Sequence, residues 1–150
     1  LNGIRVKVVD ARHLSRVESA VATYYGIPLG FVITTENDIR IYHTGDTSLF
    51  GDLRLTGMLH RPNIFLVGIG SVAEGFPTEM SPNEAALATL WVAPDVVLPM
   101  HYPPGSDAPL RFCESVKIVA PHVRAVALEP NRQLAYRKYQ LTVESLEAAS

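Results

Sequence analysis

The chain has 150 residues, of which 47% are hydrophobic and 19% charged, and its formal net charge is −2 at pH 7. This length and composition predict one domain with a substantial core, and the scattered Arg and Lys residues form no basic surface for nucleic acid or a membrane. The single cysteine, Cys113, excludes an internal disulfide and a cysteine-based zinc site, which favours a cytoplasmic location.

Three segments in the first third of the chain have the patterns of β-strands. Apolar and charged residues alternate at 4–10, which predicts a half-buried strand. Residues 29–35 and 39–43 are rich in β-forming residues and flank a turn at 36–38, so they predict a hairpin. The first residue is Leu1 rather than Met, and we therefore expect the natural chain to begin further upstream.

The middle of the chain predicts helices that alternate with buried strands. Residues 49–60 predict a helix, and the apolar run at 63–69 predicts a strand buried on both faces. Residues 82–92 form the clearest helix, because Ser81 and Glu84 make a capping box. The elements expected after it are a strand at 95–100, a helix at 109–119, strands at 124–128 and 133–137, and a helix over the last ten residues. This alternation is typical of the α/β class.

Three polar residues follow predicted strands directly. His13 lies after strand 4–10, Asp46 after strand 39–43, and His101 after strand 95–100. If these strands share a sheet and run in the same direction, the three side chains meet at one edge, where α/β proteins generally place their sites. Two imidazoles and a carboxylate suit zinc, manganese or iron. Each residue alone is also typical of a hydrogen-bonded loop or a turn, so the spacing leaves both interpretations open.

Two stretches around these residues resemble a known family. They are residues 41–52, Ile-Tyr-His-Thr-Gly-Asp-Thr-Ser-Leu-Phe-Gly-Asp, and residues 99–102, Pro-Met-His-Tyr, after the capped helix. They are similar to the metal-dependent hydrolase branch of the metallo-β-lactamase superfamily, which includes ascorbate-6-phosphate lactonase-like proteins. The resemblance runs from about residue 4 to about residue 104.

The resemblance implies an αββα sandwich with a two-metal site. It implies that His13 binds one metal, that His101 binds the other, and that Asp46 bridges both and so takes part in catalysis. A metal-held hydroxide then attacks a lactone, ester or phosphoester. Zinc is the expected ion, with manganese and iron as alternatives. Tyr102 and Ser15 are candidates for contact with the small-molecule substrate.

The chain departs from this family in two respects. Residues 71–80 differ from the family's usual loop, which borders the substrate pocket, and the main ligand motif is absent. The family's main ligand motif is His-x-His-x-Asp-His, and no two of the five histidines here are close enough to form it. The chain therefore matches only the C-terminal half of the fold, as a truncated form of it. We expect the active site to need a complementary N-terminal half. The alternative is a non-catalytic module that self-associates as a homo-oligomer through its exposed sheet face.

Two other motifs in the sequence favour different kinds of site. Gly68-Ile69-Gly70 follows a predicted strand as a dinucleotide-binding loop does, but no helix is predicted directly after it. Ser71, Asp95 and His101 occur in the order of a hydrolase triad, but Ser71 lacks the Gly-x-Ser-x-Gly elbow. Both are weaker interpretations than the metal site.

Overall fold

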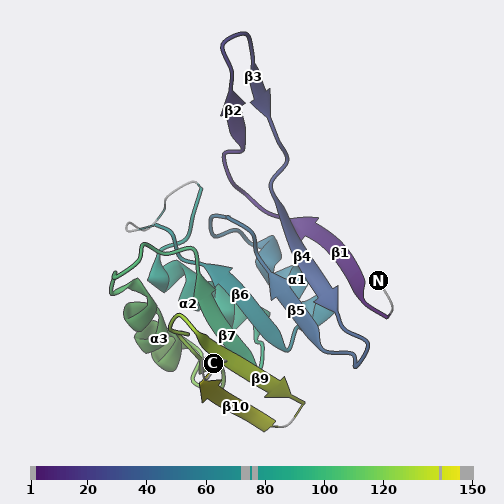
Figure 1. The fold of residues 1–150 in the computed structure, drawn as a ribbon, viewed down its shortest axis with the longest axis vertical. Helices are drawn as coiled ribbons and strands as arrows, with labels where there is room; N and C mark the ends of the chain where they lie inside the picture. Colours follow the sequence, from purple (N-terminus) through teal and green to yellow (C-terminus); the bar gives the residue numbers. More distant parts are fainter. Residues whose placement is uncertain (1–2, 72–74, 76–77, 139, 146–150) are drawn as a thin grey trace, which may run out of the picture.

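A computed structural model of the chain describes residues 3–71, 75, 78–138 and 140–145. Its strands and helices alternate much as the sequence predicts (Figure 1). In chain order they are β1 (Arg5–Asp10), β2 (Arg16–Glu18), β3 (Thr23–Tyr25), β4 (Leu29–Thr34), β5 (Arg40–His43), α1 (Asp52–His60), β6 (Ile64–Gly68), α2 (Pro82–Val92), β7 (Val96–Met100), α3 (Ala108–Val119), β8 (Arg124–Ala125), β9 (Arg132–Arg137) and β10 (Gln140–Ser145).

The main sheet has six strands in the order β1-β4-β5-β6-β7-β8. Strand β4 is antiparallel to both β1 and β5, whereas β5, β6, β7 and β8 are parallel to one another. Strands β1, β5, β6 and β7 therefore all run in the same direction. This topology confirms the α/β class and brings the C-terminal ends of those four strands to one edge of the sheet.

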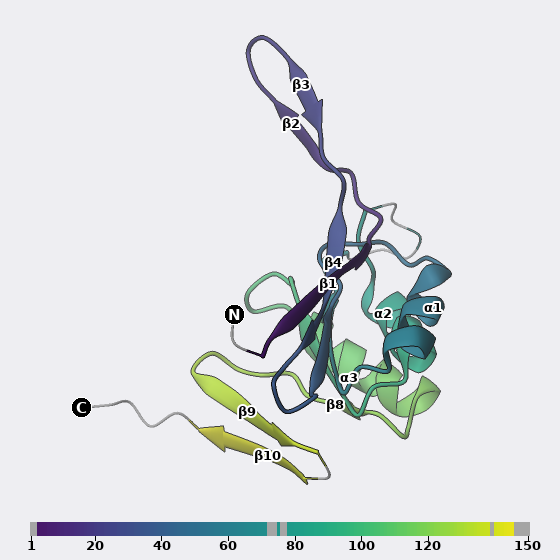
Figure 2. The ribbon, with the colours of Figure 1, turned by 90° about the vertical axis from the view of Figure 1, so that its right-hand side faces the viewer.

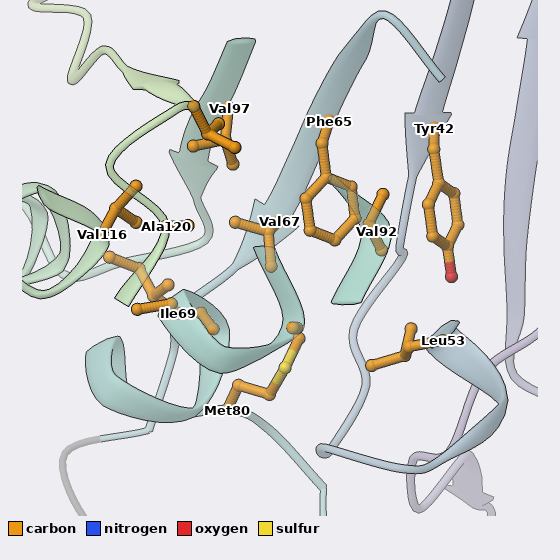
Figure 3. Close-up of a cluster of buried hydrophobic side chains, with 14 of the residues drawn as sticks. Tyr42, Leu53, Phe65, Val67, Ile69, Met80, Val92, Val97, Val116 and Ala120 are labelled. Carbon is orange, nitrogen blue, oxygen red and sulfur yellow. The ribbon is translucent and has the colours of Figure 1, made fainter. Parts of the chain in front are cut away.

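The three helices cover one face of this sheet, and the β9–β10 hairpin lies on the other side (Figure 2). The core fills the space between the sheet and the helices (Figure 3). Tyr42 and Phe65, on neighbouring strands, are fully buried there, and their rings stack with centroids 5.1 Å apart. Among the described residues, no helix has the length and apolar character needed to span a membrane.

The capping box predicted for α2 is present in full. Ser81 accepts a hydrogen bond from the backbone N–H of Glu84, and the Glu84 carboxylate accepts one from the backbone N–H of Ser81. Helix α1 begins at Asp52, three residues later than expected, and ends at His60, as predicted. Pro62 and the left-handed conformation of Arg61 mark its end.

Gly57 allows α1 and α2 to pack closely. A Cβ built on Gly57 would lie 2.6 Å from the Cα of Val92 and 3.0 Å from its carbonyl oxygen. Replacing Gly57 with Ala should therefore lower the free energy of unfolding by about 1–3 kcal/mol, because the clash outweighs the helix propensity gained. Urea denaturation measures the difference. Gly51→Ala is the control, because a Cβ there has no neighbour within 4 Å, and equal effects of the two variants would contradict the prediction.

The strand predicted at 124–128 is limited to β8 (Arg124–Ala125), and two further parts of the fold differ from the sequence predictions. The helix expected over the last ten residues is wrong for 141–145, which belong to β10 and pair with β9, while 146–150 lie outside the described residues. The alternation of apolar and polar residues from Leu141 to Ser145 suits a strand rather than a helix. No element was predicted at 16–28, yet β2 and β3 form a hairpin that extends from the sheet (Figure 1).

Candidate metal site

The structure brings the three predicted ligand residues together at one edge of the sheet. His13 lies in the loop after β1, Asp46 in the loop after β5, and His101 directly after β7. The Nε2 atom of His101 lies 3.8 Å from Oδ2 of Asp46. Both side chains are about half exposed, at 50% for His101 and 44% for Asp46. The expectation that these residues share one edge is therefore met, and their role as metal ligands stays a prediction.

A buried threonine and a glycine turn hold the Asp46 loop in place. Thr44 is fully buried, and its Oγ1 accepts a hydrogen bond from the backbone N–H of Gly68 on β6. Gly45 has a φ of 63°, and a Cβ there would lie 2.4 Å from the carbonyl oxygen of Leu29. The tight turn before Asp46 therefore requires glycine.

The His13 loop is joined to the Asp46 loop by two hydrogen bonds. The backbone N–H of Arg12 donates to Oγ1 of Thr47 at 2.8 Å, and the backbone N–H of Ser48 donates to the carbonyl oxygen of Arg12 at 2.8 Å. Thr47 is buried, so these contacts are protected from water. They hold the His13 loop against the Asp46 loop, although 33 positions separate His13 from Asp46 in the sequence.

His101 has an unusual backbone. Its φ is 57°, in the left-handed region that residues other than glycine seldom occupy. Such a conformation costs on the order of 1–3 kcal/mol and persists where the surrounding structure imposes it, often at functional sites. The preceding residue, Met100, accepts a backbone hydrogen bond from Ile69, which ties the end of β7 to the segment after β6.

A fourth polar residue, Glu79, lies at the same place and was not predicted. Its Oε1 is 3.2 Å from Nε2 of His101, and ligand atoms of His13, Asp46 and Glu79 all lie within 4.8 Å of one another. Glu79 belongs to the segment between β6 and α2, two residues before the Ser81 cap. The sequence showed that residues 71–80 differ from the usual family loop, but no motif there marked Glu79.

The two residues predicted to contact substrate, Ser15 and Tyr102, lie in different surroundings. Ser15 lines a groove of about 600 Å³ together with His13, Asp46 and residues of the β2–β3 hairpin. Tyr102 is partly buried and packs against the hydrophobic core. Ser15 is thus placed to meet a molecule in the groove, whereas the position of Tyr102 agrees with a packing role.

The two competing motifs are not assembled into sites. Asp95 lies just before β7 and His101 just after it, so the length of this strand separates them and a Ser71–Asp95–His101 triad does not form. Asp95 instead accepts hydrogen bonds from Asn63 and Tyr136. Among the described residues no helix follows β6 before Pro82, so the Gly68–Gly70 stretch does not open a dinucleotide-binding helix.

The fold and the site define a metallo-β-lactamase type of α/β protein. The family model described as the beta-lactamase superfamily domain matches residues 1–102. The chain belongs to this family. The closer resemblance to ascorbate-6-phosphate lactonase-like proteins stays a prediction.

Curated relatives and solved structures agree with this assignment. Similar proteins named metal-dependent hydrolases are found in Methanobrevibacter smithii (35% identical over 141 residues, covering 89% of this chain and 56% of the relative) and in Caldivirga maquilingensis (39% over 132 residues, covering 86% and 52%). The chain thus spans about half the length of the curated relatives it matches.

Among solved structures, a metallo hydrolase from Ignicoccus hospitalis superposes with a TM-score of 0.67 at 27% identity, covering 97% of this chain and 55% of that one. The metallo-β-lactamase fold protein YhfI from Bacillus subtilis superposes with a TM-score of 0.64 at 12% identity, covering 86% of this chain and 48% of that one. At that identity YhfI shows the shared fold alone.

Proposed function

We propose that the chain contributes metal ligands to a hydrolase that cleaves a lactone, an ester or a phosphoester. The observation that carries the proposal is that ligand atoms of His13 and Asp46 lie within 4.8 Å of one another and that Nε2 of His101 lies 3.8 Å from Oδ2 of Asp46. The names of the curated relatives, metal-dependent hydrolases, support the same reaction class.

The donor set fits a divalent cation. Neutral imidazole and carboxylate are ligands that zinc accepts readily, and manganese and iron are the alternatives. The loops that carry His13 and Asp46 are held by hydrogen bonds to the buried threonines Thr47 and Thr44. A bound divalent ion would lower the pKa of water toward neutrality and supply a nucleophile for hydrolysis.

The residues around the site have separable tasks in this proposal. The imidazoles of His13 and His101 would each hold a metal ion through a ring nitrogen, and the carboxylate of Asp46 would balance part of the metal charge. The groove beside His13 and Asp46 is large enough for a small molecule, and its walls include Tyr24 and Tyr25. Ser15 lies in this groove and can donate a hydrogen bond to a substrate oxygen.

A second layer of protein is part of the proposal, because the sheet face opposite the helices is apolar and is exposed at its β1 edge, whereas Val96 and Leu98 on β7 are buried and the β9–β10 hairpin lies on that side (Figure 2). Val32, Tyr42, Phe65 and Val97 point toward the helices, so their neighbours along each strand point to the opposite face. Two cross-strand rows result there, namely Val8–Phe31–His43–Leu66–Leu98 and Val6–Ile33–Ile41–Ile64–Val96. A complementary half-sandwich would cover them and bring further ligands.

Metal content tests the proposal directly. After exposure to zinc or manganese and removal of free ions, elemental analysis should find about one or two ions per chain. His13→Ala should lose them, while His122→Ala, which changes an exposed loop histidine, should retain them. With a complementary half present, the metal-loaded protein should also hydrolyse members of a panel of lactones and phosphoesters. Metal content at background in the unmodified protein would contradict the proposal.

The open apolar face also favours a second candidate function. Val6 and Val8 are 53% and 52% exposed on the edge strand β1. A contiguous apolar face of this kind is typical of an interface. The second proposal is therefore a non-catalytic module that self-associates through this face, with two-fold symmetry as the commonest arrangement.

A further inference from the structure

A basic hollow lies at the β1 edge of the sheet, beside the C-terminal end of α1. Its charged lining residues are Arg5, Lys7, Arg40 and His60, and its volume is about 250 Å³. We propose that this basic hollow binds the phosphate group of a small molecule. It lies near the starts of β1 and β5, whereas the candidate metal site follows the C-terminal ends of these strands, so the two sites are separate.

The strand register places these cations on one face of the sheet. Val32 of β4 points toward the helices and is buried in the core, and Lys7 lies opposite it on β1. Thr34, two residues further along β4, points to the same side. Its partners on the two neighbouring strands are Arg5 and Arg40. Cations that are scattered in the sequence therefore meet on three adjacent strands.

Carboxylates leave most of this positive charge uncompensated. Arg5 pairs with Asp38 at 3.9 Å, but both side chains are mostly exposed, so water screens the pair. Among the described residues, Lys7, Arg40 and His60 have no carboxylate partner, and no acidic residue lines the basic hollow. The net charge of the whole chain is −2, so this local excess does not follow from composition. A concave site lined by charges of one sign attracts an ion of the opposite sign.

Arg40 is held in position and keeps unused hydrogen-bond donors. Its Nη1 donates to the carbonyl oxygen of His60 at 2.9 Å, and its backbone N–H donates to Oδ1 of Asn63 at 3.0 Å. Its buried Nε–H has no acceptor in the part of the chain that the structure describes. A guanidinium carries several N–H donors in a planar fork that matches the oxygens of phosphate. Because His60 takes up only one of them, donors remain for a phosphate group.

The imidazole of His60 responds to the same charges. Burial lowers its pKa, and the positive charges of Lys7 and Arg40 lower it further. Arg5 lines the same hollow and Arg61 follows His60 in the chain, so the charged neighbours on β1, β5 and α1 are all cations. A bound anion would offset these charges and raise the pKa of His60. By linkage, the affinity for the anion should increase as the pH falls through that pKa.

Size and charge favour a phosphate group over a larger partner. Sites for drug-sized molecules have volumes of about 300–1,000 Å³, so a hollow of about 250 Å³ suits a small anion. Lys7 and Arg40, the two permanent cations without a carboxylate partner, match the charge of a phosphate monoester near neutral pH. The hydroxyl of Thr34 lies in the same lining and can donate a further hydrogen bond. A nucleic acid would need a wider basic surface.

Equilibrium dialysis of the metal-free protein with radiolabelled inorganic phosphate, at constant ionic strength, tests the proposal. We expect Lys7→Gln to bind phosphate about tenfold more weakly than the unmodified protein, because one charged hydrogen-bond donor is lost. Lys117→Gln, the same change at an exposed position of α3, should bind like the unmodified protein. His13→Ala should also retain phosphate, because His13 lies at the other end of the sheet. Equal binding by Lys7→Gln and the unmodified protein would place the phosphate elsewhere and overturn the proposal.

Competition with glycerol phosphate distinguishes the two sources of the phosphate group. Stronger competition than by inorganic phosphate would identify a phosphorylated small molecule as the ligand, and equal competition would identify free phosphate. If the unmodified protein binds neither, the proposal is wrong. The cations would then serve only to balance the C-terminal dipole of α1 and to protect the edge strand β1 from pairing.

Nuclear magnetic resonance of the His60 ring gives a second readout. Sulfate is a suitable probe, because it resembles phosphate and its own charge stays constant over the pH range in which histidine titrates. Saturating sulfate should raise the pKa of His60 in the unmodified protein and raise it less in Lys7→Gln. An unchanged pKa of His60 would show that the anion does not occupy the basic hollow.

Discussion

Asp46→Asn should weaken zinc binding by more than about 100-fold. The change removes a carboxylate whose oxygen lies 3.8 Å from Nε2 of His101, and it keeps the size of the side chain. An amide carries no charge to balance the ion and is a poorer donor than a carboxylate. The loss should therefore exceed the 10–100-fold that accompanies loss of a supporting group around a metal ligand. Competition with a zinc-binding dye measures the affinity.

The control for this variant is Asp107→Asn. Asp107 is exposed at the start of α3, and its side chain makes no capping hydrogen bond. The two variants change the net charge equally, so a general electrostatic effect would weaken zinc binding in both. Zinc binding by Asp46→Asn at the strength of the unmodified protein would remove Asp46 from the ligand set. Circular dichroism of each variant separates loss of the site from loss of the fold.

The sequence predicted those parts of the fold that burial and capping control. The apolar run at 63–69 has no interruption because β6 lies inside the sheet, between two parallel neighbours. Helix α2 was predicted with its observed bounds because Ser81, Pro82 and Glu84 specify where it starts. The prediction that His13, Asp46 and His101 meet assumed that β1, β5 and β7 run in the same direction. The sequence could not establish this, since strand order depends on pairing between distant segments.

The β2–β3 hairpin was not predicted because its strands bury little of their side-chain surface. Every residue of both strands is exposed, including Val17, Tyr24 and Tyr25. Alternation of apolar and polar residues arises when one face of a strand is buried. A hairpin that extends into solvent buries neither face, so its apolar and polar residues need not alternate. The groove that it forms beside His13 could not be predicted for the same reason.

Three of the four residues at the candidate site were found from the sequence, and the fourth was not. His13, Asp46 and His101 each follow a strand, and strand ends can be recognised from local pattern. Glu79 reaches the site through an irregular segment, and its approach depends on the missing side chain of Gly70. Nothing in the local sequence distinguishes Glu79 from a solvated carboxylate before a helix cap. Its position follows only from contacts between segments.

The double variant Val6→Lys, Val8→Lys should prevent association through the open sheet face. Both side chains point to that face from β1, and both are more than half exposed, so lysine there leaves the core intact. In an interface the two ammonium groups would lose water without gaining partners, at a cost of several kcal/mol. The dissociation constant should therefore rise by more than about 100-fold.

Sedimentation equilibrium of the chain measures this effect. We expect the unmodified chain to associate and the double variant to sediment as a monomer. The matched control is Leu110→Lys, Ile118→Lys, which adds the same charge at positions 67% and 80% exposed on α3, on the helical side of the sheet (Figure 2). It should associate like the unmodified chain, because both substitutions lie on α3 and leave the face that carries the Val6 and Val8 rows unchanged. Equal behaviour of the two double variants, or a monomeric unmodified chain at high concentration, would show that this face does not drive self-association.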